Sequence, residues 1–154
     1  MVRGRRTARL VGAMMLAAAL TACGGREADR RVPLDTFSAE EIYKRGEWEL
    51  ENGRKGADAA YYFGEVERLY PYSEWAKRAL IMQAYAAHKD RDYQTSRSAA
   101  QRYIDTYPAE DDAAYAKYLL ALSYYDQIDE VGRDQGLTFQ ALQALRAVIE
   151  EYPD

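Results

Sequence analysis

The chain has 154 residues, enough for one domain with a modest core, and a formal net charge of −4. Residues 1–22 hold four of the 21 basic residues and none of the 25 acidic ones, so the remaining 132 residues carry 17 basic and 25 acidic residues, a net of −8. This balance argues against a general binder of nucleic acid or anionic membranes, which would present a basic stripe. The single cysteine, Cys23, excludes an intramolecular disulfide and a CxxC redox or zinc site.

Residues 1–22 have the pattern of a secretory signal peptide. Four arginines and no acidic residue precede an apolar run over residues 10–20, which is shorter than the roughly 20 residues that a membrane-spanning helix needs. The segment ends in four residues that resemble the lipobox of bacterial lipoproteins: Leu20, Thr21, Ala22 and Cys23. The resemblance implies cleavage before Cys23. The alternatives are an ordinary signal peptide with an incidental cysteine, or a buried helix.

Cys23 is then the first residue of the mature protein. The lipobox resemblance implies a diacylglycerol group on its thiol and an N-acyl chain such as palmitate on its freed amine, with no other cofactor. Two or three acyl chains give a stable anchor, whereas one chain binds a membrane only marginally. Residue 24 is glycine, whereas an Asp directly after the cysteine would resemble an inner-membrane retention signal. We therefore expect a lipid-anchored protein on the periplasmic face of the outer membrane.

Residues 23–36 are polar, with paired glycines and a proline, and are predicted to form an acylated tether. A flexible chain of this length reaches roughly 20 Å on average. We interpret this segment, including its arginines at positions 26, 30 and 31, as a solvated linker. The alternative is that these arginines rest on anionic headgroups.

Residues 37–154 are predicted to form a helical repeat domain. The dipeptide Tyr-Pro ends three similar segments, at Pro71, Pro108 and Pro153, and these prolines are 37 and 45 residues apart. A period in this range is typical of a solenoid built from helix pairs. No alternating strand pattern bounded by hairpin turns is present. The fold class is therefore all-α, with three repeats.

Local signals predict the helices of each pair. Ser38 and Glu41 form a capping box that starts a helix ending near residue 52, and a second helix stops before the first Tyr-Pro. The second pair is predicted over residues 74–89 and 93–106, with Ser73 as the cap of its first helix. The third pair is predicted over residues 112–129 and 138–151, joined by a longer turn that contains Gly132 and Gly136.

The small residues that precede the prolines form a pattern that resembles the tetratricopeptide repeat family. In the second pair, Ala84, Ser96 and Pro108 are 12 and 12 residues apart, as the small and proline positions of that family are. This resemblance implies that the helices of each pair approach closely at these small side chains.

A more specific resemblance covers nearly the whole chain. The lipobox, the short tether and the segments 39–46, 63–73, 103–108 and 118–124 resemble the BamD family, the lipoprotein subunit of the outer-membrane β-barrel assembly machinery. The resemblance implies a non-enzymatic scaffold that joins BamA and other subunits and helps receive unfolded outer-membrane protein precursors. Its rival is another periplasmic tetratricopeptide lipoprotein, serving pilus assembly or cell-wall synthesis.

The C-terminal end departs from that family, which has about five repeats. The sequence stops directly after the third Tyr-Pro, and a solenoid normally ends in a polar capping helix. Ala141, Leu142, Leu145 and Val148 are expected to keep an uncovered side. We therefore expect a sequence truncated at its C-terminus, without the repeats in which the family makes its main contact with BamA.

The concave surface of a tetratricopeptide solenoid is lined by the first helix of each pair. Aromatic rings with few charged partners suit an extended peptide with apolar and aromatic side chains, such as the C-terminal strand of a barrel precursor. The alternative for each residue is packing between helices. The family's groove positions fall on Tyr43, Glu47, Leu50, Arg78, Ile81, Tyr85, His88, Lys117, Leu120 and Tyr124.

Catalysis and metal binding are not expected. The sequence has no GxSxG, HExxH, Walker or dinucleotide glycine pattern, and His88 is its only histidine. The adjacent acidic pairs suit helix ends better than general acid–base work. The alternative to a scaffold without catalytic activity is a lipoprotein enzyme that acts on the cell wall.

Overall fold

The computed structural model describes residues 33–53, 55–128 and 135–153. The chain divides into two units, Met1–Pro33 and Leu34–Asp154, and every helix described belongs to the second. The lipobox, Cys23 and most of the expected tether lie outside the described residues. The elements are η1 (Leu34–Thr36), α2 (Ala39–Asn52), α3 (Gly56–Leu69), α4 (Glu74–Lys89), α5 (Tyr93–Thr106), α6 (Ala113–Tyr125) and α7 (Gln135–Glu151).

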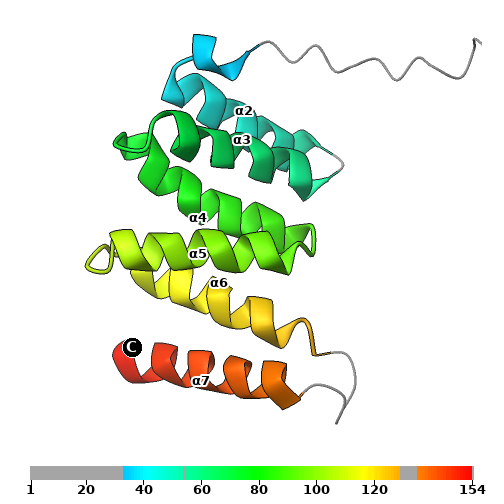
Figure 1. Cartoon of the computed structure of the whole chain (residues 1–154), viewed down its shortest axis with the longest axis vertical. Coiled ribbons are helices and arrows are strands. Elements are labelled where there is room, and N and C mark those ends of the chain that lie inside the picture. The colour runs from blue at the N-terminus through cyan, green and yellow to red at the C-terminus, as the bar shows by residue number, and fades with distance from the viewer. Residues whose placement is uncertain (1–32, 54, 129–134, 154) are drawn as a thin grey trace, which may run out of the picture. The chain divides into compact units, whose positions relative to one another are not determined.

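The helices of the second unit form a stack in chain order (Figure 1). Each helix from α2 to α6 packs against the next one, and the first helices of successive pairs also touch, α2 against α4 and α4 against α6. No strand occurs in the part of the chain that the structure describes. The prediction of an all-α solenoid made of three tetratricopeptide-like helix pairs is confirmed. None of the helices α2–α7 has the length and apolar character that a bilayer-spanning helix requires.

The predicted capping box starts α2. The Ser38 hydroxyl accepts a hydrogen bond from the Glu41 backbone N–H at 3.3 Å, and the Glu41 carboxylate accepts one from the Ser38 backbone N–H at 2.8 Å. The Ser38 hydroxyl also donates to the Glu41 carboxylate at 2.7 Å, and the bonds that this carboxylate accepts from the Ser38 N–H and hydroxyl lower the pKa of Glu41. Just before the cap, Leu34 and Phe37 pack on the first core cluster, so the packed structure already begins within residues 34–36.

The second pair has the predicted bounds, because strong signals mark each end. The Ser73 hydroxyl accepts from the Ala76 N–H at 3.1 Å, and the Asp92 carboxylate accepts from the Thr95 N–H at 3.1 Å. Between the two helices Arg91 has a φ of 65°, the left-handed conformation that closes this short turn. Pro108 then follows the end of α5.

The third pair differs from its prediction at two boundaries. Helix α6 ends at Tyr125 instead of near residue 129, because Asp126 and Gln127 turn the chain. Helix α7 begins at Gln135 instead of residue 138, so Gly136 lies in its first turn and not in the connecting loop. Glycine costs a helix little near its end, where the backbone hydrogen bonds are incomplete. Residues 129–134 lie outside the described ranges.

Two buried clusters share α4. The first joins α2, α3 and α4 around the fully buried Phe63, and the second joins α4, α5 and α6 around the fully buried Tyr103. Between α5 and α6 the buried Ser123 hydroxyl donates to Ser96 Oγ at 2.9 Å. Small side chains therefore lie where paired helices approach, as the repeat pattern predicts.

Polar contacts also tie the pairs together. The Arg102 guanidinium on α5 donates to both Glu67 carboxylate oxygens on α3, at 2.9 and 2.8 Å, and to Gln83 Oε1 on α4 at 2.9 Å. At the other end of α3 the Gly56 N–H donates to the Asp90 carboxylate at 3.1 Å. Hydrogen bonds near both ends of α3 therefore add to the apolar packing that holds the pairs together.

Candidate functional site

On α2 the predicted groove residues belong mostly to the helix packing. Tyr43 is buried, with its ring centroid 5.2 Å from that of Phe63 and 5.0 Å from that of Trp75. Leu50 packs against the first core cluster, and only Glu47 is exposed. Burial, and secondarily Glu47, raise the pKa of Tyr43. Tyr43 is therefore a core residue and not part of an open ligand surface.

On α4 the predicted groove positions divide into two sets. Arg78 and Tyr85 are exposed, with the Arg78 guanidinium 5.5 Å from the Trp75 ring centroid. Ile81 is buried, which favours the alternative that it packs between helices. His88 Nε2 lies 3.0 Å from the Asp126 carboxylate, so this side chain joins α4 to the end of α6.

On α6 the three predicted residues contact the protein itself. Lys117 forms an ion pair with Glu151 of α7, and its Nζ lies 5.4 Å from the Tyr152 ring centroid. Leu120 packs against the second core cluster. The Arg97 guanidinium of α5 covers the Tyr124 ring at 4.9 Å. These three side chains therefore face α5, α7 and the core.

Another flank of α6 carries an exposed aromatic stripe that the sequence prediction missed. Tyr115, Tyr118 and Tyr125 are 40%, 43% and 56% exposed, and their spacing of three and seven residues places them on one face of the helix. Tyr85 of α4 is 38% exposed and is close enough to Tyr115 to interact with it electrostatically. We call these four residues the tyrosine surface.

Three residues of the tyrosine surface, Tyr85, Tyr115 and Tyr118, are close neighbours. Burial raises the pKa of Tyr115, and the neighbouring Tyr85 and Tyr118 raise it further. The Tyr115 and Tyr118 rings have centroids 6.4 Å apart. Tyrosine offers a large apolar face with a polar tip, a combination that is common at protein interfaces. The helical spacing of Tyr115, Tyr118 and Tyr125 could have indicated this exposed face from the sequence. The groove positions of the repeat family instead assigned residues 117, 120 and 124 to the ligand-facing side of α6.

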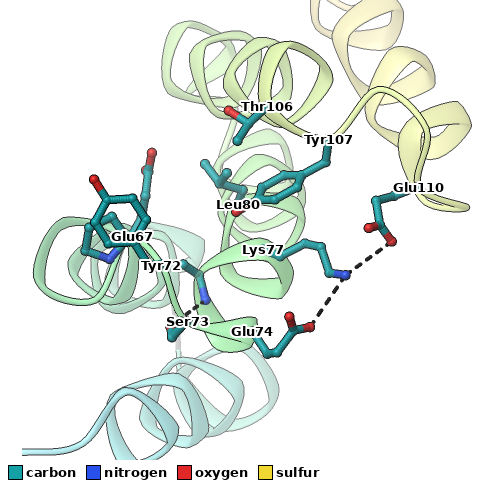
Figure 2. A pocket seen from close by; sticks show the side chains of 11 residues that line it. Glu67, Tyr72, Ser73, Glu74, Lys77, Leu80, Thr106, Tyr107 and Glu110 are labelled. Atoms are coloured by element: carbon teal, nitrogen blue, oxygen red, sulfur yellow. Dashed lines mark hydrogen bonds and ion pairs between the residues drawn. The ribbon is translucent and has the colours of Figure 1, made fainter.

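A separate cavity of about 500 Å³ lies between the α3–α4 turn and the end of α5 (Figure 2). We call it the turn pocket. Both Tyr-Pro turns of the first two pairs contribute to it. Its lining consists of Glu67, Pro71, Tyr72, Ser73, Glu74, Ala76, Lys77, Leu80, Thr106, Tyr107 and Glu110.

Ion pairs organise the mouth of the turn pocket. Lys77 Nζ lies 3.5 Å from a Glu74 carboxylate oxygen and 3.2 Å from one of Glu110, and Figure 2 shows the lysine reaching toward both. The hydrogen bond to Glu110 raises the pKa of Lys77. Within residues 33–53, 55–128 and 135–153, no group of three or more His, Cys, Asp or Glu side chains could hold a metal ion.

Comparisons with known proteins agree with this fold. A family model described as YfiO, outer membrane lipoprotein, matches residues 35–154. An outer membrane protein assembly factor BamD from Caulobacter vibrioides is 38% identical over 149 residues, 97% of this chain and 48% of its own length. The BamD protein of Rickettsia prowazekii is 36% identical over 101 residues, 66% of this chain and 40% of its own length. The chain thus spans about half the length, or less, of these curated relatives.

Proposed function

The chain belongs to the YfiO family of outer membrane lipoproteins, and on this premise we propose that it acts as a scaffold in the assembly of β-barrel proteins at the outer membrane. The observation that carries the proposal is the 38% identity to an outer membrane protein assembly factor over nearly the whole chain. A stack of helix pairs suits this work, because it offers extended surfaces for several proteins at once.

We propose attachment by lipid at Cys23, on the periplasmic face of the outer membrane. The support is the order of an arginine-rich start, a short apolar run and the sequence Leu-Thr-Ala-Cys. A diacylglycerol and an N-acyl chain together would give the stable anchor that a single chain cannot. Held close to the membrane, the scaffold would meet membrane-bound partners at a high effective concentration.

The tyrosine surface is the region we propose for unfolded precursors. Four exposed tyrosines on the adjacent helices α4 and α6 present apolar ring faces with hydroxyls at their tips. An extended precursor strand with aromatic side chains could stack on these rings while its backbone bonds to the hydroxyls. Of the predicted groove residues, Tyr85 belongs to this surface, whereas Tyr43 and Ile81 are buried and Leu120 packs against the second core cluster.

The proposed partners are BamA and the other subunits of the assembly machinery, together with the precursors. The proposed role is not enzymatic, since the relatives are named as assembly factors and a scaffold works by binding alone.

Affinity purification of the full-length protein from detergent-solubilised outer membranes tests the proposal. We expect BamA to copurify in an amount comparable to the bait, and to be absent from a parallel purification of an unrelated lipoprotein. Recovery of pilus or cell-wall synthesis proteins without BamA would contradict the proposal.

A further inference from the structure

The turn pocket shares no residue with the tyrosine surface and has a different chemistry. Its floor is apolar, because Leu80 and Ala76 are almost completely buried beneath it. Pro71 and the half-buried Tyr107 ring form parts of its sides. At about 500 Å³ it has the size of a typical binding cleft, which is enough for one or two side chains of a bound segment.

An exposed aromatic ring stands at this pocket. The Tyr72 side chain is fully exposed, more than any other large apolar side chain in the described residues. It lies directly after Pro71, whose ring fixes the backbone at this turn. The rigid turn limits the backbone entropy that is lost on binding, and tyrosine is among the residues that dominate interface energies.

The charges at the mouth are mainly negative. Lys77 is the inner group of its ion-pair cluster, with its side chain 24% exposed, compared with 47% for Glu110 and 84% for Glu74. Two carboxylates share this single ammonium, and the exposed Asp111 and Asp112 follow Glu110 in the chain. The outermost groups around the apolar floor are therefore carboxylates, which favour a cationic ligand and oppose an anionic one.

We propose that the turn pocket binds an extended segment of a partner protein in which an arginine lies within two positions of an apolar residue. The apolar side chain packs on Leu80 and Tyr107. The guanidinium bonds to the carboxylates of Glu74 and Glu110, and the Tyr72 ring packs on the segment from the other side of the pocket (Figure 2). Arginine suits this mouth better than lysine, because its planar fork can bridge two carboxylates.

Peptide selection tests this assignment. A random heptapeptide phage library is selected on the full-length lipoprotein in detergent, with the Tyr72→Ala/Glu110→Gln double variant as soluble competitor. We expect the enriched peptides to carry an arginine within two positions of a Leu, Ile, Phe or Met. A synthetic copy of one enriched peptide should bind the wild type about tenfold more tightly than it binds Glu110→Gln, the loss typical of one removed charge-assisted contact.

Matched variants separate the pocket from other surfaces. Glu150→Gln and Trp48→Ala change an exposed carboxylate and an exposed ring elsewhere, and both should keep the wild-type affinity. Citrulline in place of the peptide's arginine, which keeps the shape without the charge, should weaken binding about tenfold. The assignment is overturned if no peptide is enriched, if the enriched peptides lack arginine, or if Glu110→Gln binds as well as wild type. A peptide that loses affinity with Tyr118→Ala instead binds the tyrosine surface, which overturns this assignment and leaves the proposed function standing.

Discussion

The Gly46 backbone on α2 lies directly against the Phe63 ring on α3. A Cβ atom placed at Gly46 would fall 2.8 Å from Phe63 Cε1 and 2.9 Å from Cδ1, closer than real Cβ atoms approach. Phe63 is fully buried at the centre of the first cluster, so its ring cannot move into solvent. The glycine therefore sets how closely the two helices of the first pair can pack.

Gly46→Ala should lower the free energy of unfolding by about 1 kcal/mol in urea denaturation. Overpacking costs about 1–3 kcal/mol, and the better helix propensity of alanine returns about 1 kcal/mol. In a Phe63→Leu background the clash is absent, so the same substitution should be neutral or stabilising. The Phe63→Leu background is the control, and an equally large loss on substituting Gly46 in that background would show that the Phe63 contact is not the cause.

Tyr103→Phe should raise the free energy of unfolding by about 1 kcal/mol at pH 7. The Tyr103 hydroxyl is buried and has no hydrogen-bond partner among the described residues. Burying such a group costs roughly 1–3 kcal/mol, and phenylalanine fills the same space without that cost. Urea denaturation of both proteins measures the difference, and a destabilised variant would mean that the hydroxyl has a partner after all.

The wild-type protein should also lose stability at alkaline pH faster than Tyr103→Phe. Burial, and then Asp112 and Glu110, raise the pKa of Tyr103 to about 12. The unfolded chain ionises this phenol near pH 10, while the folded chain keeps it protonated. Ionisation of this phenol therefore does not affect stability below pH 10, and it lowers the free energy of unfolding as the pH rises from 10 to 12, by about 1 kcal/mol per pH unit. Unfolding curves at pH 9, 10 and 11 should diverge between the two proteins; parallel curves would contradict the raised pKa.

Arg102→Lys should destabilise the stack by about 1 kcal/mol. Lysine cannot donate to both oxygens of Glu67 and to Gln83 at once, and partial exposure of the pair limits the effect. Arg68→Lys is the matched control, because the Arg68–Glu65 pair lies within the single helix α3 and should contribute less than about 0.5 kcal/mol. Equal effects in thermal denaturation would mean that Arg102 does not join the pairs.

A photo-reactive amino acid at position 118 should crosslink to the C-terminal strand of a barrel precursor, and one at position 124 should not. Both positions are tyrosines of α6, but Tyr118 belongs to the exposed stripe and Tyr124 lies beneath Arg97. We expect at least fivefold more adduct at 118, quantified on denaturing gels. Equal yields, or more adduct at 124, would move the precursor site away from the tyrosine surface.

Cys23→Ser should abolish labelling with radioactive palmitate and release the protein from the outer-membrane fraction. Its circular-dichroism spectrum should match that of the wild-type protein, because residue 23 precedes every helix described. Labelling of the variant at the wild-type level would contradict lipid attachment at this residue.

Strong local signals explain why much of the fold was predictable from the sequence. Ser73, Asp92 and the prolines mark the ends of α4 and α5, and the structure has these helices at the predicted bounds. No proline or glycine directly follows Tyr125, so the sequence predicted that α6 ends at residue 129, four residues after its end in the structure. Helix ends without a specific capping signal depend on tertiary contacts, which a local pattern does not contain.

The candidate site was less predictable, because it depends on the rotation of each helix about its axis. On α4 two of the four predicted positions, Arg78 and Tyr85, are exposed, whereas on α6 the predicted positions face the neighbouring helices and the core. Two residues along a helix correspond to a rotation of about 200°, so this small shift in register selects almost the opposite side. The turn pocket could not be found either, since it combines residues from two turns more than 30 positions apart.

The uneven sharing of buried residues along the stack has a consequence for its dynamics. Helix α4 contributes to both core clusters, whereas α7 has a single buried residue, Ala141, and Phe139, Leu142 and Ile149 are exposed. A helix that buries few side chains opens locally at a lower free-energy cost than one packed into two clusters. Amide hydrogens of α7 should therefore exchange with solvent through local opening, long before those of α4. A helix that opens while its neighbours stay folded can exchange its contacts without unfolding of the packing around α4.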